Sequence, residues 1–143
     1  MYSFTIEDQP NSEDVELLAQ GLTAHALPHT QVPGFHSIAS FMRDEQGELV
    51  GGAWGYINWN WLSVGLVWLA EDLRGGGHGR QLLWALESVA RERGCQFVHL
   101  DTFSYQARPF YEKLGYEVFA TLEDYPPGQR RFFMKKALDA PSQ

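Results

Sequence analysis

The sequence predicts an α/β (α+β) fold in which a central sheet of six to seven strands is flanked by helices. Three observations favour this class. The run Trp61–Leu69 is apolar on both faces, as expected of a central strand. Several other short runs are bounded by turn residues, which is typical of strands. After a glycine cluster, apolar residues repeat at helical spacing, at Leu82, Leu83, Leu86, Val89 and Ala90.

The N-terminal third is less regular. Residues 2–6 alternate weakly between apolar and polar side chains, which predicts a first strand at the edge of the sheet. The polar pair at 11–12 can cap a helix, and two carboxylates follow in its first turn, where the helix dipole favours them. Gly21 weakens the middle of this segment, so we expect two short helices that end before Pro28. We expect a loop over residues 25–34.

The middle of the chain reads as a hairpin and a helix. Residues 35–42 and 49–57 are expected to form strands joined by a turn at 44–47, and a second turn leads into the central strand. Glycines within 49–57 leave room for another backbone or a ligand. The helix that follows the glycine cluster is expected to run to Arg93, with Gly94 just beyond its end.

The C-terminal part continues the alternation of strand and helix. Residues 97–100 form a short buried run, and Pro109 is placed for the first turn of a helix over 110–114. Two further strands are expected at 116–122 and 131–135, followed by a tail. Because no linker or repeat interrupts this order, we expect a single domain over residues 1–143.

Composition narrows the classes of function. The chain has 143 residues and a formal net charge of -7, which disfavours a nucleic-acid partner and favours a cationic substrate. The N-terminus lacks a basic and apolar leader, and no apolar stretch has membrane-spanning length, so we expect no membrane partner and a cytoplasmic location. Cys95 is the only cysteine, which excludes an internal disulfide and a multi-cysteine metal site. We therefore expect no metal.

The glycine cluster lies between the central strand and the helix that follows. Glycines allow a tight turn with bare N–H groups, and the first turn of a helix adds unpaired donors and a positive dipole end. Arg74 and Arg80 add full positive charge on either side. A Walker loop would end in Gly-Lys-Ser/Thr, and a dinucleotide fingerprint would need a glycine at position 80 or 82, so neither fits. The predicted phosphate-binding residues are Arg74, Gly75, Gly76, Gly77, His78, Gly79 and Arg80; the alternative is a flexible glycine-rich connector.

Two motifs resemble those of one family. The pattern Arg-x-x-Gly-x-Gly, at residues 74–79, resembles the pyrophosphate loop of the GNAT N-acetyltransferase superfamily. Residues 107–116 resemble the segment that reads Ala-x-x-Phe-Tyr-x-Lys-x-Gly-Tyr/Phe in these enzymes. The motifs also occur in the family's order. The resemblance implies a mixed, mostly antiparallel sheet, with acetyl-CoA as cosubstrate.

The resemblance also implies residue roles. Tyr111 corresponds to the tyrosine near the coenzyme sulfur, which makes it the candidate general acid, because a phenol stays protonated at neutral pH. The alternative for Tyr111 is an aromatic ring packed under the short helix. Backbone groups of Val67, Trp68 and Leu69 would pair with the pantetheine arm and polarise the thioester carbonyl. Ser104 stands where many members carry an asparagine that contacts this arm.

The general base is not fixed by the sequence. Acetyl transfer needs a neutral amine, an oxyanion partner and a proton for the leaving thiolate. Members of the family often place a carboxylate on the strand before the glycine loop, but residues 59–70 contain none. The candidates that remain are His36, Asp101, Glu123, and a water held by Ser63 and Tyr56.

Aromatic side chains crowd the hairpin before the loop, at Trp54, Tyr56, Trp59 and Trp61. In a substrate cleft they would favour a cationic or aromatic amine; alternatively, they are core and dimer-interface residues, and a homodimer is left open. We expect an acetyl-CoA-dependent N-acetyltransferase that acts on a primary amine of a small molecule. Two alternatives stay open: a protein N-terminal or lysine acetyltransferase, and a non-catalytic acyl-CoA-binding sensor domain.

Overall fold

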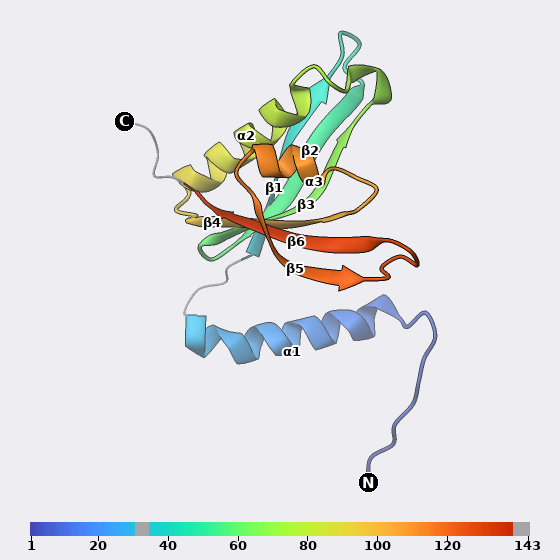
Figure 1. Cartoon of the computed structure of the whole chain (residues 1–143). Coiled ribbons are helices and arrows are strands. Elements are labelled where there is room, and N and C mark those ends of the chain that lie inside the picture. Colours follow the sequence, from blue (N-terminus) through green and yellow to red (C-terminus); the bar gives the residue numbers. More distant parts are fainter. Residues whose placement is uncertain (31–34, 139–143) are drawn as a thin grey trace. The chain divides into compact units, whose positions relative to one another are not determined.

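A computed structural model describes residues 1–30 and 35–138 of the chain, which divides into two compact units, 1–34 and 35–143. Each unit is described by itself (Figure 1). The elements, in chain order, are α1 (Ser12–Thr30), β1 (Phe35–Arg43), β2 (Leu49–Asn58), β3 (Trp61–Leu69), η1 (Glu71–Leu73), α2 (His78–Glu92), β4 (Phe97–Phe103), α3 (Arg108–Lys113), β5 (Glu117–Glu123) and β6 (Arg130–Ala137).

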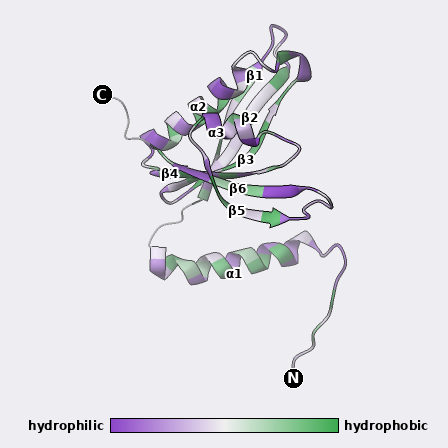
Figure 2. Ribbon diagram, viewed as in Figure 1, coloured by the Kyte–Doolittle hydropathy of each residue, from purple (hydrophilic) through white to green (hydrophobic). Residues whose placement is uncertain are grey.

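The first unit consists of an extended N-terminal segment and helix α1. The side chain of Asn11 accepts a hydrogen bond from the Glu13 N–H at 2.8 Å, which confirms the expected cap. No residue of α1 is buried within the unit, and apolar and polar residues mix along the helix (Figure 2). Among residues 1–30 and 35–138, no helix is long and apolar enough to cross a membrane.

Three expectations for this unit are wrong. Residues 2–6 form no strand. The helical segment is one continuous helix rather than two, and it continues through Gly21 and past Pro28 to Thr30. The expected loop over 25–34 is therefore helical in its first six residues, while 31–34 lie outside the described residues. A proline costs an internal hydrogen bond and crowds the preceding turn, but this one lies in the last turn, where the helix ends soon after.

The second unit is built on a six-stranded sheet with the order β1-β2-β3-β4-β6-β5. Every neighbouring pair is antiparallel except β3 and β4, which are parallel. The mixed, mostly antiparallel sheet is confirmed, as is the order of strands and helices from residue 35 onward. The parallel pair is possible because the connection from β3 to β4 carries helix α2.

One face of the sheet is packed under α2 and α3. Along β4 the side chains of Val98, Leu100 and Thr102 are buried, whereas the alternate residues are half-buried or exposed. Such alternation is expected of a strand with one covered face. Leu83 and Leu86 of α2 are nearly inaccessible and belong to the same core cluster. We call this side the helix face of the sheet and the other side the open face, within the second unit.

A buried ion cluster joins α2 to the C-terminal strands. The Glu87 carboxylate is 3% exposed and lies 2.9 Å from the Lys136 ammonium group. It also accepts a hydrogen bond from the Tyr116 hydroxyl and lies 3.9 Å from a nitrogen of Arg91. Burial, followed by the adjacent carboxylate, raises the pKa of Tyr116 strongly. A buried carboxylate requires such partners, so the cluster fixes how α2 meets β6.

Candidate functional site

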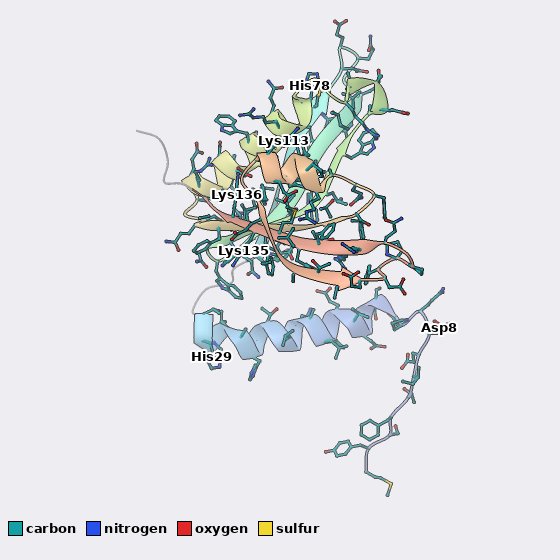
Figure 3. The ribbon with its side chains drawn as sticks, in the orientation of Figure 1. Asp8, His29, His78, Lys113, Lys135 and Lys136 are labelled. Atoms are coloured by element: carbon teal, nitrogen blue, oxygen red, sulfur yellow. The ribbon has the colours of Figure 1, made fainter. Side chains whose placement is uncertain are left out.

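The glycine loop has the backbone geometry expected of it. Gly75 and Gly77 adopt left-handed conformations, with φ of 84° and 85°, which glycine reaches without steric cost. Gly77 is the N-cap of α2, and Gln81 is the first residue of the helix to donate back to it. The N–H groups of residues 78–80 thus have no partner within the helix. His78 lies at the start of α2 (Figure 3).

Positive charge surrounds this helix start. Arg74 and Arg80 are both exposed, and no acidic residue lies in the first turn of α2. The Arg74 Nε donates to the Leu69 carbonyl at 3.0 Å, which holds the loop against the end of β3. The two acidic residues before the loop form a short 3-10 helix, η1, which the sequence did not predict. Bare N–H groups, a helix dipole and two cations together favour an anion.

Strands β3 and β4 separate beside this loop. They pair only over Trp61–Ser63 and the three residues from Phe97 to His99. Beyond this point β4 keeps β6 as its partner, but β3 continues to Leu69 with no partner on that side among the described residues. We call this opening the fork. Its β3 edge carries unpaired backbone groups, and Val67, Trp68 and Leu69 lie on it.

A bulge lies at the start of the fork. The register between β2 and β3 shifts at Trp54 and Gly55, so Gly65 has no residue directly opposite. The Trp54 ring covers Gly65, and a Cβ atom at position 65 would lie 2.7 Å from it. A side chain at this position would have to displace the Trp54 ring. A bulge redirects the backbone groups beside it, which is common next to active sites.

Tyr111 lies on α3, which contacts the first turn of α2 through Phe110 and Gly79. Its side chain is 8% exposed and its ring packs edge-on against Phe110 and Tyr116. Burial and the nearby Asp101 carboxylate raise the pKa of Tyr111 to about 12. Its hydroxyl has no hydrogen-bond partner among the described residues. Every fully buried polar side-chain atom of those residues does have a partner, so this hydroxyl is not fully buried. The hydroxyl is therefore protonated at neutral pH and reaches solvent.

A row of polar side chains crosses the open face at the rung where the fork begins. The register places Tyr56 opposite Ser63, Ser63 opposite His99, and His99 opposite Lys135. Residues paired in this way point to the same face. Ser37 and Glu117 extend the row to both edges of the sheet. We call these six residues the polar row: Ser37, Tyr56, Ser63, His99, Lys135 and Glu117.

The candidate bases differ in their surroundings. His36 lies 2.9 Å from a guanidinium nitrogen of Arg93, at the C-terminal end of α2. Glu123 pairs with Arg130 at 3.1 Å near the end of β5. Asp101 lies beside the fork, where its carboxylate accepts a hydrogen bond from the Arg131 Nε at 2.9 Å. The structure thus brings Asp101, Ser63 and Tyr56 to the fork, and leaves His36 and Glu123 outside it.

Ser104 is already engaged. Its hydroxyl donates to the Gln129 side chain at 2.6 Å and accepts from the Arg130 N–H at 2.9 Å. A hydroxyl has one hydrogen to donate and two acceptor lone pairs, so Ser104 could donate to the pantetheine arm only by giving up the bond to Gln129, but could still accept one further hydrogen bond. The predicted role of Ser104 stays a prediction.

A cavity of about 210 Å³ lies between α2, α3 and β6. Four of the lining side chains are cationic, and the one carboxylate, Glu87, is already paired. Arg80 connects the cavity to the glycine loop, and Lys113 lies on α3 (Figure 3). The lining residues are Arg80, Leu83, Trp84, Glu87, Arg91, Lys113, Leu114 and Lys136.

These features fit the parts of acetyl-CoA. The pyrophosphate is a dianion that matches the helix start and its two arginines. The pantetheine arm is an extended chain with amide groups, and the free edge of β3 offers complementary N–H and C=O groups. Within residues 1–30 and 35–138, no group of three His, Cys, Asp or Glu side chains is placed to hold a metal ion.

Sequence reasoning missed two features of this site. The first is the fork, because a sequence does not reveal where strand pairing stops. The second is His99, which shares a strand face with Phe97 and Asp101 and alternates with the buried side chains of Val98 and Leu100. That alternation was visible in the sequence and could have placed His99 beside Asp101, one of the candidate bases.

Comparisons with known proteins agree with this geometry. The model of the acetyltransferase (GNAT) family matches residues 7–116. A blasticidin-S acetyltransferase from Streptomyces morookaense is 40% identical over 101 residues, covering 70% of this chain and 74% of the relative. Among solved structures, an acetyltransferase from Bacillus cereus has a TM-score of 0.81 and 29% identity, covering 96% of this chain and all of the other. A protein from Agrobacterium tumefaciens that was assigned as an acetyltransferase has a TM-score of 0.89 and 26% identity, covering 95% and 99%.

Proposed function

Because the chain belongs to the acetyltransferase (GNAT) family, we propose that it moves an acetyl group from acetyl-CoA to a primary amine of a small molecule. The family uses acetyl-CoA as cosubstrate, and N-acetyltransferase activity follows from the membership. One observation supports the finer proposal: the fork and the glycine loop share one end of β3, and Gly79 in the first turn of α2 contacts Phe110 of α3, the helix that carries Tyr111.

The proposed coenzyme site has two parts. The loop Arg74 to Arg80 would hold the pyrophosphate through bare N–H groups and cationic side chains. The free edge of β3 at Val67, Trp68 and Leu69 would pair with the pantetheine arm. The cationic cavity beyond Arg80 supports the same orientation, since it favours the remaining phosphate of the coenzyme.

Tyr111 is proposed as the acid that protonates the leaving thiolate. Thiols titrate near ~8.5, so a thiolate takes a proton from a suitably placed donor at neutral pH. The raised pKa of Tyr111, about 12, keeps the phenol protonated until the thiolate forms, and transfer to the weaker base is completed because the acceptor nitrogen returns a proton to the phenol oxygen. Its hydroxyl makes no hydrogen bond among the described residues, so it is free to donate.

Two observations support a small-molecule acceptor. The relative that acetylates blasticidin-S, a small molecule, is 40% identical to this chain. In addition, aromatic rings lie beside the fork, where Trp54, Trp61 and Phe103 stand on the same face of the sheet as Asp101. Ring faces and a carboxylate attract a cationic or planar amine.

The test is a thiol-release assay with purified protein, acetyl-CoA and a panel of three acceptors. The panel consists of blasticidin S, kanamycin and a short peptide with a free N-terminus. We expect saturable release with at least one of the two small molecules and little release with the peptide. Preference for the peptide would favour a protein acetyltransferase instead. Absence of release with all three, despite saturable acetyl-CoA binding, would favour a non-catalytic sensor.

We propose that residues 1–143 act as one domain, because the family match begins at residue 7, within the first unit, and continues into the second. A cytoplasmic location, a homodimer and the lack of nucleic-acid and membrane partners stay predictions.

A further inference from the structure

His99 lies where the strands of the fork part. It is opposite Ser63 on the last rung that β3 and β4 share, and opposite Lys135 on β6. Its ring meets the Trp61 ring edge-on, with 5.6 Å between centroids. The imidazole is thus held by packing on the open face, at the centre of the polar row.

The ring nitrogens of His99 remain available. The His99 side chain makes no hydrogen bond among the described residues. Every fully buried polar side-chain atom of those residues has a partner, so the ring nitrogens of His99 are not fully buried. The nitrogens therefore contact solvent although the residue is half-buried. Burial lowers the pKa of His99, and the Asp101 carboxylate offsets part of this effect. The imidazole is neutral at pH 7 and can accept a proton.

His99 and Tyr111 flank the fork from opposite sides. Tyr111 belongs to α3 and to the core cluster on the helix face. His99 alternates with the buried Val98 and Leu100 and so points to the open face. Asp101 lies two residues from His99 on the same face of β4, and its carboxylate raises the pKa of both His99 and Tyr111.

We propose that His99 accepts the proton that the acceptor amine must lose before it attacks, directly or through one water held by the polar row. This inference rests on the proposed function. It selects a residue outside the four candidates considered from the sequence, and it makes Asp101 a positioning residue that stabilises the protonated imidazole.

The ammonium form of the acceptor gives one proton to the His99 imidazole, which later passes it to solvent. The neutral nitrogen then bonds to the acetyl carbon, and the bond between that carbon and the sulfur breaks. Tyr111 gives its proton to the departing thiolate, and the second proton lost by the nitrogen restores the phenol. Amide, thiol and one released proton are the products.

Other charged groups face the same region and affect its titration. Lys135 on β6 lies directly opposite His99, and Glu117 on β5 lies opposite Lys135, while Asp101 on β4 raises the pKa of His99. Arg131 on β6 neutralises part of the Asp101 charge at 2.9 Å. Strand β3 contributes only Trp61 and Ser63, which carry no charge.

The closing experiment compares wild-type protein with His99→Gln, using the best acceptor of the three-member panel. The readout is the pH dependence of kcat/KM between pH 5 and 9. We expect the wild-type rate to fall with unit slope below the pKa of His99. His99→Gln should lose this limb and about 10² in kcat, with unchanged acetyl-CoA affinity. His36→Gln is the matched control and should behave as wild type.

A second readout does not depend on turnover. Proton NMR of the imidazole ring, assigned with His99→Gln, should give His99 a pKa below the usual 6.5 in the coenzyme-free protein. An unchanged acid limb in His99→Gln, or a His99 that stays protonated above pH 8, would overturn the inference. Lack of thiol release by the wild type with every acceptor would instead refute the proposed function, so the two failures are distinguishable.

Discussion

Gly79 in the first turn of α2 packs against the ring of Phe110 in α3, so that a Cβ atom at position 79 would lie 3.4 Å from that ring. The two motifs that resemble one family in the sequence therefore meet in space. The contact holds the start of α2 next to the helix that carries Tyr111. The anion-binding loop and the proposed acid thus have a fixed relationship.

Gly79→Leu tests this contact. The larger side chain must displace the Phe110 ring or project toward the bare N–H groups, so we expect acetyl-CoA to bind at least about tenfold more weakly, a loss of about 1.4 kcal/mol. Isothermal titration calorimetry measures the affinity. Gly21→Leu is a control, since position 21 is also helical and nothing lies within 4 Å of its Cβ. Equal affinity in both variants would argue against a phosphate site at this helix start.

Gly77→Ala separates backbone conformation from stability. Position 77 has φ of 85° and open space around its Cβ, as does position 47 with φ of 82°. An alanine in a left-handed conformation costs about 1–2 kcal/mol at either site. Thermal unfolding should therefore show similar losses for Gly77→Ala and Gly47→Ala. Only Gly77→Ala should weaken acetyl-CoA binding, and a similar weakening in both would point to a general loss of folded protein.

Tyr111→Phe removes the proposed proton donor. Because the hydroxyl makes no hydrogen bond among the described residues, its loss leaves no unpaired group and should change stability little. We expect kcat to fall by about 10²–10⁴-fold, with unchanged acetyl-CoA affinity. Steady-state kinetics and calorimetry on the same preparations measure both quantities. An unchanged kcat would show that the Tyr111 ring only packs in the core beneath its own helix.

The pH dependence of Tyr111 follows from its raised pKa. The acid must keep its proton, and its pKa is about 12 rather than the usual value near 10. Deprotonation of Tyr111 should therefore cause no fall in the rate between pH 9 and 10.5. The difference in tyrosinate absorbance between wild type and Tyr111→Phe should appear only above pH 11.

The protonated phenol also favours the folded state, a contribution lost as pH rises from about 10 to 12. Titration of Tyr111 near pH 10 would contradict the burial of its side chain.

Lys136→Met tests the buried ion cluster. The change leaves the Glu87 carboxylate with the Tyr116 hydroxyl and a nitrogen of Arg91 at 3.9 Å. Removing one partner of a buried pair costs about 3–5 kcal/mol, because the other charge stays buried. Urea unfolding should show this loss, while the exposed control Lys113→Met should change stability by less than about 0.5 kcal/mol. Equal losses of stability in the two variants would mean that Tyr116 and Arg91 are sufficient partners for the buried Glu87 carboxylate.

Local patterns predicted most of the second unit. Alternation and turn residues placed β1 to β3, and the amphipathic pattern with Gly94 at its end placed α2. Gly94 has φ of 92°, as a helix-ending glycine should. The failures lie where local preference is weak. Residues 2–6 alternate but form no strand, because a strand also needs a partner, which a sequence pattern does not supply.

The candidate site was predicted only in part. The glycine loop and Tyr111 each belong to a contiguous motif, so the sequence alone predicts a role for their residues. The fork depends on where pairing between β3 and β4 stops, after Ser63 and His99, which is a relationship between distant segments. Ser104 was selected by its position in a motif, but its hydroxyl donates a hydrogen bond to the side chain of Gln129, which lies in the turn between β5 and β6. Such partners are set by tertiary structure.

The most direct test of the proposed coenzyme site is an NMR titration of the ¹⁵N-labelled full chain with acetyl-CoA. We expect saturable shifts of the backbone N–H signals of residues 67–69 on the edge of β3 and of residues 75–80 in the glycine loop. The signals of residues 44–48, in the turn between β1 and β2, should stay unchanged. Saturable binding that leaves residues 67–69 and 75–80 unshifted, or no binding at millimolar acetyl-CoA, would contradict the proposal that the fork and the glycine loop hold the coenzyme.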